Sequence, residues 1–315
     1  MNISDKDNIL RITAPAKINL HLEILGLRDD GFHELAMLMQ SIGLSDQLEI
    51  KKRNDNKVIL TTDDINLTTN EDNLIIKAAR ILKSKANCFA LGADIYLRKK
   101  IPIGAGLAGG SSDGAAALLG LNNIWRLNFS LMELQDLAAE LGSDMPFCLK
   151  GGSQLCFGRG EKLEELHLEN SAMGVLLIKD PLVSVSTPWA YKRYKEINEA
   201  KYMNSESDFE RRRKILRNEN FLENSELKNS FLIRNDLQKI VETEVKAVEK
   251  SLKALTNLPG HLAVSMSGSG PSCFALYSNY NEAKEVFDKY RKSLQELGLE
   301  VWCCPFRSNG VLEEI

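Results

Sequence analysis

A glycine-rich segment, PIGAGLAGGSSDGA at residues 102–115, constrains this chain more than any other part of its sequence. It holds five glycines and two serines, and it lies between a predicted strand at Ala93–Leu97 and a predicted small-residue helix at Gly114–Trp125. At such a junction the first backbone amides of the helix have no partners, the helix dipole adds partial positive charge, and glycine lets an anion approach closely. A tight turn alone would need only one or two glycines. The segment therefore predicts a phosphate-binding loop.

Two common phosphate-binding motifs fit this loop poorly. Gly104, Gly106 and Gly109 match the G-x-G-x-x-G pattern, but no second strand ending in an acidic residue follows ~20 residues on, as a dinucleotide-binding fold requires. Gly104 and Gly109 also have the spacing of a Walker A loop, but Gly110 stands at the position of its lysine. Other positive charges must then neutralise a bound phosphate, and the candidates are Mg²⁺, Lys17, Lys99 and Lys100.

Outside this loop, the hydrophobic pattern predicts a mixture of strands and helices. In the first half we expect two strands able to pair with each other at Leu10–Ile12 and Ile18–Ile24, further strands at Leu48–Lys52 and Val58–Thr62, and helices at Asp72–Lys85 and Ser130–Leu141. In the second half we expect strands at Val175–Ile178, His261–Ser265 and Cys273–Tyr277, and helices at Leu237–Leu255 and Asn281–Leu297. That second order of elements is typical of a compact α+β domain.

The distribution of charge along the chain bears on whether this protein binds nucleic acid. Residues 192–217 carry nine lysines and arginines against five acidic residues, which is compatible with an RNA-binding patch or with a solvent-exposed helical insertion. The interspersed acids favour the insertion. The net charge is −3 and the isoelectric point about 5.9, so no overall field attracts nucleic acid or an anionic membrane.

Cysteine usage and the first residues bear on the compartment. The six cysteines form no C-x-x-C pair and only four histidines accompany them, so a zinc cage is not expected. Buried free thiols in a reducing compartment are the simpler interpretation. The first residues are polar and acidic, unlike a signal peptide. We therefore expect a cytoplasmic protein, or a stromal one if a plastid transit peptide has been lost.

Three further motifs have both an ordinary and a chemical interpretation. Lys17 in PAKIN could face solvent on an edge strand, but burying its charge would require an acidic partner. His33 in GFHE could be a structural histidine beside an aromatic residue. Asp144 in GSDMPF, expected between a helix and a strand-like apolar run, could satisfy turn amides, or act as a base if a charged group lies beside it.

Taken together, these motifs resemble the GHMP kinases. The resemblance rests on APAKINLHLEILGLRDDGFHEL, IPIGAGLAGGSSDGAAALLGLN, LGSDMPFCLKGGSQLCFGRGE and SGSGPSCFAL, in the family's order from about residue 11 to 285. The glycine-serine loop alone is typical of the whole superfamily. The combination A-K-x-N, G-[YF]-H-E and G-[AS]-D-x-P is more specific, and it is most similar to the members that act on a cytidine-diphosphate-linked sugar alcohol.

The resemblance implies an α+β architecture of two domains. The N-terminal α/β domain, residues 1–168, would hold the ATP loop and the catalytic residues, and would contain a βαβ unit of the unusual left-handed sense. A ferredoxin-like domain, residues 169–315, would follow, with the charged insertion near 192–230. Both ligands would bind in the cleft between the two domains.

The resemblance also implies roles for individual residues. Asp144 would take the proton of the substrate hydroxyl, and Lys17 would lie beside it and stabilise charge at the reaction centre. Asn19, Phe32, His33 and Tyr191 would bind the substrate, with His33 at the edge of the cytosine and Tyr191 stacked on it; Phe32 stands where the family commonly has tyrosine. ATP would contact Asn73, near the adenine, and the loop residues Pro102, Ile103, Gly104, Ala105, Gly106, Leu107, Ala108, Gly109, Gly110, Ser111 and Ser112, with Ser111 or Ser112 near Mg²⁺.

The expected function is therefore ATP-dependent phosphorylation of a cytidine-diphosphate-linked methylerythritol at its tertiary 2-hydroxyl, in non-mevalonate isoprenoid synthesis. One alternative is another GHMP small-molecule kinase, acting on homoserine, mevalonate or a sugar. A second is a nucleotide-binding sensor without catalysis, against which the presence of both Lys17 and Asp144 argues. Phe32, His33 and Tyr191 favour the first, since only cytosine needs a pocket that stacks on the base and contacts its edge.

Overall fold

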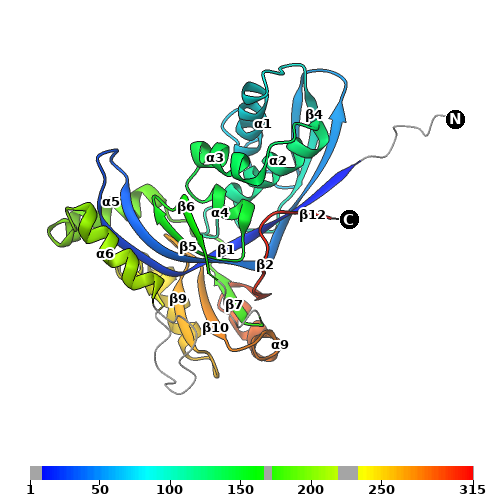
Figure 1. The fold of residues 1–315 in the computed structure, drawn as a ribbon. Helices are drawn as coiled ribbons and strands as arrows, with labels where there is room; N and C mark the ends of the chain where they lie inside the picture. Colours follow the sequence, from blue (N-terminus) through cyan, green and yellow to red (C-terminus); the bar gives the residue numbers. More distant parts are fainter. Residues whose placement is uncertain (1–8, 167–171, 219–232, 315) are drawn as a thin grey trace.

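Two long antiparallel strands organise the fold. The structure is a computed structural model, and it describes residues 9–166, 172–218 and 233–314. β1 (Leu10–Leu27) pairs with β2 (His33–Arg53) along its whole length, and both extend across the molecule in Figure 1. The prediction of two separate strands at 10–12 and 18–24 that pair with each other is wrong, because both belong to β1. Pro15 has no N–H to donate, and the pairing register shifts between Pro15 and Lys17, so a bulge carries the strand past the proline.

The first sheet has eight described strands, in the order β12-β1-β2-β4-β3, with β5 paired to β2, β6 to β5 and β8 to β1. Its other strands are β3 (Val58–Thr62), β4 (Gly92–Arg98), β5 (Ser153–Gly158), β6 (Lys162–Glu165), β8 (Arg234–Asn235) and β12 (Leu312–Glu313). β3 and β4 are parallel neighbours, and the chain crosses between them through α1 (Leu74–Lys85). The remaining helices of this lobe are α2 (Gly109–Trp125), α3 (Leu131–Leu141) and α4 (Met145–Lys150).

The second sheet has four antiparallel strands in the order β11-β7-β10-β9. They are β7 (Gly174–Lys179), β9 (Ala263–Met266), β10 (Cys273–Tyr277) and β11 (Glu300–Pro305), joined with α7 (Gln238–Glu244), α8 (Lys246–Thr256) and α9 (Tyr280–Glu296). This β-α-β-β-α-β order is ferredoxin-like, as expected. The single long helix expected at 237–255 is wrong, because Val245 has an extended backbone (φ −116°, ψ 91°) and separates α7 from α8.

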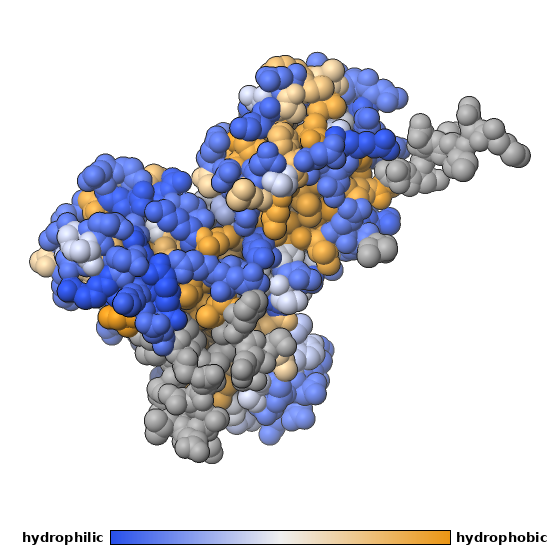
Figure 2. All heavy atoms as spheres, in the orientation of Figure 1, coloured by the Kyte–Doolittle hydropathy of each residue, from blue (hydrophilic) through white to orange (hydrophobic). Residues whose placement is uncertain are grey.

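The charged segment forms α5 (Thr187–Asn198), a short 3₁₀ turn η1 (Glu199–Lys201) and α6 (Glu206–Arg217). The surface over α5 and α6 is mostly hydrophilic in Figure 2, as expected for an exposed insertion. However, the inner side of α6 is pinned by ion pairs: Arg213 is buried against Glu34, and Arg212 binds Glu23 at 2.7 Å. Residues 219–230 of the predicted insertion and the predicted domain boundary at 168 lie outside the described residues.

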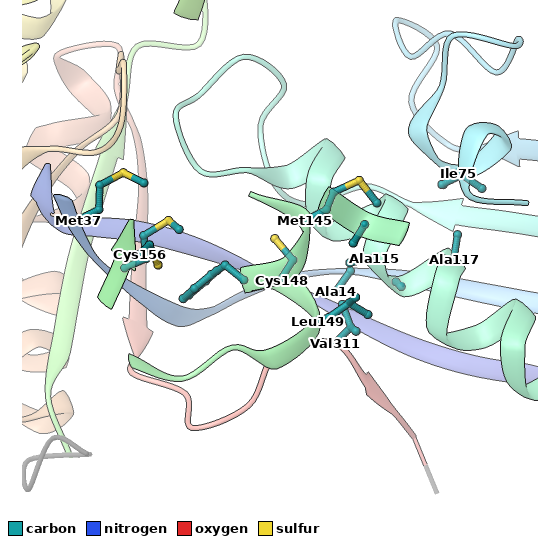
Figure 3. Close-up of a cluster of buried hydrophobic side chains, with 14 of the residues drawn as sticks. Ala14, Met37, Ile75, Ala115, Ala117, Met145, Cys148, Leu149, Cys156 and Val311 are labelled. Atoms are coloured by element: carbon teal, nitrogen blue, oxygen red, sulfur yellow. The ribbon is translucent and has the colours of Figure 1, made fainter. Parts of the chain in front are cut away.

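Small residues on α2 let the helices α1 and α4 pack closely against it. A Cβ at Gly114 of α2 would lie 2.9 Å from the methyl group of Met145 and 3.0 Å from the Cβ of Leu74. Figure 3 shows the cluster, with Met145 of α4 beside Ala115 of α2. Larger side chains on α2 would push α4 away from it. The small-residue pattern of α2 thus decides where the start of α4 lies.

The cysteines agree with the expectation of free thiols. All six cysteines are free, and four of them are buried: Cys148, Cys156, Cys273 and Cys304. No helix in the described ranges combines the length and apolar character needed to cross a bilayer.

Candidate active site

A cavity of about 930 Å³ contains most of the residues proposed from the sequence. Its walls come from β1, the glycine-rich loop, the starts of α2 and α4, α5, and a second glycine-rich turn after β9. Fifteen predicted residues line it: Lys17, Asn19, Phe32, His33, Pro102, Ile103, Gly104, Ala105, Gly106, Ala108, Gly109, Gly110, Ser111, Asp144 and Tyr191. Three predicted residues do not line it: Asn73, Leu107 and Ser112.

Lys17 and Asp144 both line this cavity and form an ion pair. Lys17 follows the bulge in β1 and is buried, and its Nζ lies 3.4 Å from Asp144 Oδ2 and donates a 2.6 Å hydrogen bond to Asn19 Oδ1. Asp144 is the residue before α4, so the strand-like run expected after it is wrong. A short apolar run does not distinguish strand from helix by its periodicity, and Pro146 in the first turn favours the helix.

The glycine-rich loop leads directly into α2. This helix begins at Gly109, earlier than the predicted Gly114, after Ala108 in the left-handed conformation (φ 56°). No side chain of the described residues caps the helix, so its first-turn N–H groups are left for another acceptor. Ser111 lines the cavity, whereas Ser112 is buried and its hydroxyl donates to the Pro15 carbonyl at 2.8 Å.

A buried cluster of three charges lies behind the loop. Lys99 Nζ is 2.5 Å from Asp46 Oδ2 and 2.9 Å from Asp113 Oδ2, and all three side chains are at most 6% exposed. Asp46 Oδ1 also accepts from the amides of Lys100 and Ile101, at the entry to the loop. The cluster therefore ties β2 and the loop entry to the first turns of α2, and the charge of Lys99 is already shared between two carboxylates.

Asp113 is the unusual member of that cluster. Burial, together with the charge of Asp46, raises the pKa of the Asp113 carboxyl well above its usual range, against the lowering effect of Lys99. Its Oδ1 is buried and has no hydrogen-bond partner in the described part of the chain. Asp113 also lines the cavity beside Ser111. An oxygen donor without a partner is thus available at the phosphate loop.

A second glycine-rich turn, SGSGPS at residues 267–272, packs on the first loop. Ser267 Oγ donates to the Gly106 carbonyl at 3.0 Å. A Cβ at Gly106, which has φ +74°, would lie 2.2 Å from the carbonyl oxygen of Ser267. Gly268 and Ser269 of this turn line the cavity. In the sequence these residues only contributed to the family resemblance, through SGSGPSCFAL, and no site role was predicted for them.

Aromatic side chains form the other end of the cavity. His33 lies between two tyrosines: its ring centroid is 5.2 Å from that of Tyr191 and 5.7 Å from that of Tyr202. Burial, together with the charge of Lys195, lowers the pKa of His33. Phe32 is half exposed, and the Arg159 guanidinium lies 5.0 Å from its ring centroid. Lys99 was a candidate for phosphate neutralisation, but three further cavity-lining cations were not predicted, because isolated basic residues carry no local signal: Arg159, Lys192 and Lys195.

Asn73 is the N-cap residue of α1. It caps α1, because its side chain accepts from the Ile75 amide at 2.9 Å and donates to the Thr68 carbonyl at 2.8 Å. Its neighbour Leu74 lines the cavity, together with Leu67. The proposed contact of Asn73 with adenine stays a prediction.

Comparison with known proteins finds two family models that match this chain. The model of the GHMP kinases N terminal domain matches residues 73–152, and that of the GHMP kinases C terminal domain matches residues 192–296. A 4-diphosphocytidyl-2-C-methyl-D-erythritol kinase of Prochlorococcus marinus (strain MIT 9313) is 56% identical over 305 residues, covering 97% of this chain and 96% of the relative.

Solved structures share the same fold. A crystal structure of 4-(cytidine 5'-diphospho)-2C-methyl-D-erythritol kinase is 28% identical with a TM-score of 0.66, covering 94% of this chain and 98% of the other. A homoserine kinase from Cytophaga hutchinsonii is 18% identical with a TM-score of 0.67, covering all of both chains, and this likeness concerns the fold alone.

Proposed function

We propose a function from the premise that this chain belongs to the GHMP kinases and, within them, to the family of the 4-diphosphocytidyl-2-C-methyl-D-erythritol kinases. It transfers the γ-phosphoryl group of ATP to the 2-hydroxyl of that cytidine-diphosphate-linked alcohol, a step of the non-mevalonate route to isoprenoid precursors. One observation carries the proposal: the phosphate loop, the Lys17–Asp144 pair and the aromatic end with His33 share one cavity. Cytoplasmic location remains a prediction.

The reaction needs a base, a positioned phosphoryl group and compensation of charge. Asp144 accepts the proton of the substrate hydroxyl while that oxygen bonds to the γ-phosphorus, and the bond from γ-phosphorus to the bridging oxygen of ADP breaks. Lys17, 3.4 Å from Asp144, offsets the negative charge that develops on the attacking oxygen. Asn19 holds the ammonium of Lys17 through its 2.6 Å hydrogen bond and lies where it can contact the substrate.

The phosphates of ATP bind at the start of α2. Free first-turn amides and the open approach at Gly110 support this assignment. Mg²⁺ prefers oxygen ligands and usually takes one or two from the protein beside the phosphate oxygens. The Ser111 hydroxyl and the unpartnered Oδ1 of Asp113 fit that donor set. When bound there, Mg²⁺ would neutralise charge on the transferring phosphoryl group.

The cytosine binds at the aromatic end. His33 is aromatic, partly buried and lines the cavity, and Phe32 and Tyr191 offer ring faces on which a base can stack. Arg159, Lys192 and Lys195 line the same end and would attract the diphosphate that follows the cytidine. A homoserine or mevalonate kinase has no substrate group that needs stacking on aromatic rings.

Turnover with purified protein tests the proposal. ATP consumption and ³¹P NMR of the product are followed with 4-diphosphocytidyl-2-C-methyl-D-erythritol, and in parallel with homoserine, mevalonate and galactose. We expect turnover with the cytidylyl substrate alone. Preferred turnover with one of the others would make the chain a different GHMP kinase, and ATP binding without turnover of any would favour a sensor.

A further inference from the structure

The hydroxyl of Tyr202 lies 2.8 Å from His33 Nε2. Tyr202 follows η1, is 9% exposed, and its ring stacks on Tyr194 with centroids 6.2 Å apart. The next residue also holds the segment in place, because the Met203 amide donates to the Leu25 carbonyl at 2.8 Å. These contacts hold the phenol in a fixed position beside the imidazole.

The direction of this hydrogen bond follows from the two groups. Burial, together with the charge of Glu199, raises the pKa of Tyr202 to about 12, so the phenol keeps its proton at neutral pH. Burial, together with the charge of Lys195, lowers the pKa of His33, so the imidazole is neutral and carries one N–H. If Nε2 donated, the phenolic proton would have no acceptor in the described part of the chain. The favoured arrangement therefore has the phenol donating to Nε2.

We propose that Tyr202 is a specificity-determining residue, which holds the proton of His33 on Nδ1 and thereby makes this histidine a fixed donor toward a cytosine base. The inference rests on the proposed function in assigning the ligand. Nδ1 has no partner among the described residues, and His33 lines the cavity. N3 of cytosine is an acceptor, whereas N3 of uracil carries a proton. A fixed Nδ1–H complements the first base and opposes the second.

Tyr202→Phe tests the proposal because it removes one oxygen and keeps the ring. Without the phenol, the imidazole can move its proton to Nε2 and accept from the N3–H of uracil. Tyr277→Phe is the matched control, because the buried Tyr277 hydroxyl has no hydrogen-bond partner in the described ranges and lies in the second sheet, away from the cavity. Thermal melting of both variants verifies that they fold.

The first measurement is the tautomer of His33 in the free protein, by ¹⁵N–¹H NMR of the histidine side chains. The chain has four histidines, so His33→Gln identifies the signals. We expect an unprotonated Nε2 in the parent and in Tyr277→Phe, and a mixture of tautomers in Tyr202→Phe. A parent protein with the proton on Nε2 would overturn the proposal.

The second measurement is calorimetric affinity for cytidine 5'-diphosphate and uridine 5'-diphosphate, which needs no turnover. We expect the preference for the cytidine ligand to fall about 3–10-fold in Tyr202→Phe, the net worth of one hydrogen bond, and to stay unchanged in Tyr277→Phe. An unchanged preference in Tyr202→Phe would overturn the specificity role. Failure of the proposed function can be told apart from failure of this inference. In that case the parent protein would not phosphorylate the cytidylyl substrate, although its His33 tautomer and its preference for the cytidine ligand were as expected.

Discussion

Lys17 and Asp144 form an ion pair whose two members differ in exposure. Their charged atoms are 3.4 Å apart, but the lysine side chain is 6% exposed and that of the aspartate 30%. A buried ammonium is costly unless a counter-charge and hydrogen bonds accompany it, so Lys17 depends on its partners. Asp144 keeps an accessible side on the cavity, where a substrate hydroxyl can reach it. The lysine is thus the structural anchor of the pair, and the aspartate is the group that can exchange a proton.

Removing the base should stop catalysis without stopping binding. Asp144→Asn keeps the shape of the side chain but removes its proton acceptor, and turnover should fall by about 10²–10⁴. ATP affinity, measured by calorimetry, should change little because the base acts after the complex has formed. Turnover close to that of the parent would exclude Asp144 as the base.

Lys17→Ala should lower turnover by a similar factor, since the pair acts as one unit. The double variant with Asp144→Asn should then be far less impaired than the product of the two single effects. Steady-state kinetics on all three proteins measures the coupling. Strictly multiplicative losses would mean that the residues act independently.

Two adjacent glycines should respond differently to substitution. A Cβ at Gly110 meets no described atom within 4 Å, so Gly110→Val should obstruct the phosphates, raise the KM for ATP at least about tenfold and leave the melting temperature unchanged. At Gly109 a Cβ would lie 2.9 Å from Ile101 and 3.3 Å from Lys99 Nζ. Gly109→Val should therefore cost about 1–3 kcal/mol of stability. An unchanged KM in Gly110→Val would contradict phosphate binding at this turn.

A substitution at His33 should weaken binding of the cytidylyl substrate without weakening binding of ATP. His33→Ala should weaken binding of the cytidylyl substrate by about 1–3 kcal/mol, because a base-edge group loses its partner. The KM for ATP should remain nearly constant. His261→Ala serves as control, since this histidine binds the Leu258 carbonyl through Nδ1 and does not line the cavity. Equal weakening of both ligands in His33→Ala would make His33 a structural residue.

Acid should destabilise the fold through Glu23. Burial opposes ionisation of this carboxyl, but its hydrogen bond with His21 and the charges of Arg234 and Arg212 prevail and lower its pKa from 4.5 to about 2. A depressed carboxyl pKa contributes stability that is complete above the unfolded value and is lost as pH falls toward the folded value. The shift corresponds to about 3 kcal/mol at neutral pH.

Urea unfolding of Glu23→Gln at several pH values measures this contribution. The variant should be less stable than the parent at pH 7, and the difference should narrow as the pH falls from about 5 to about 2. Glu285→Gln, at an exposed position of α9, is the control, and its free energy of unfolding should equal that of the parent at every pH. A pH-independent difference for Glu23→Gln would contradict the depressed pKa.

Local patterns in the sequence were enough for the features that depend on neighbouring residues. Ser130 and Glu133 have the S-x-x-E spacing of a capping box and form one, and Asn73 caps α1. The glycine-rich loop leads into a helix start without a side-chain cap. In each case the backbone groups involved lie within a few residues of the side chain that satisfies them, so the pattern itself determines the geometry.

Tertiary structure alone decided which distant residues meet. No local sequence pattern predicts that Asp46 and Asp113 both pair with Lys99. Likewise, no pattern near His33 predicts its hydrogen bond with Tyr202. Asp46 meets Lys99 because β2 pairs with β4, and His33 meets Tyr202 because the segment after η1 packs against the start of β2. Local residue patterns specify which kinds of site this chain builds. The packing of its two sheets decided the partners of each charge and ring, because a buried polar group takes whichever partner the fold brings within hydrogen-bond distance.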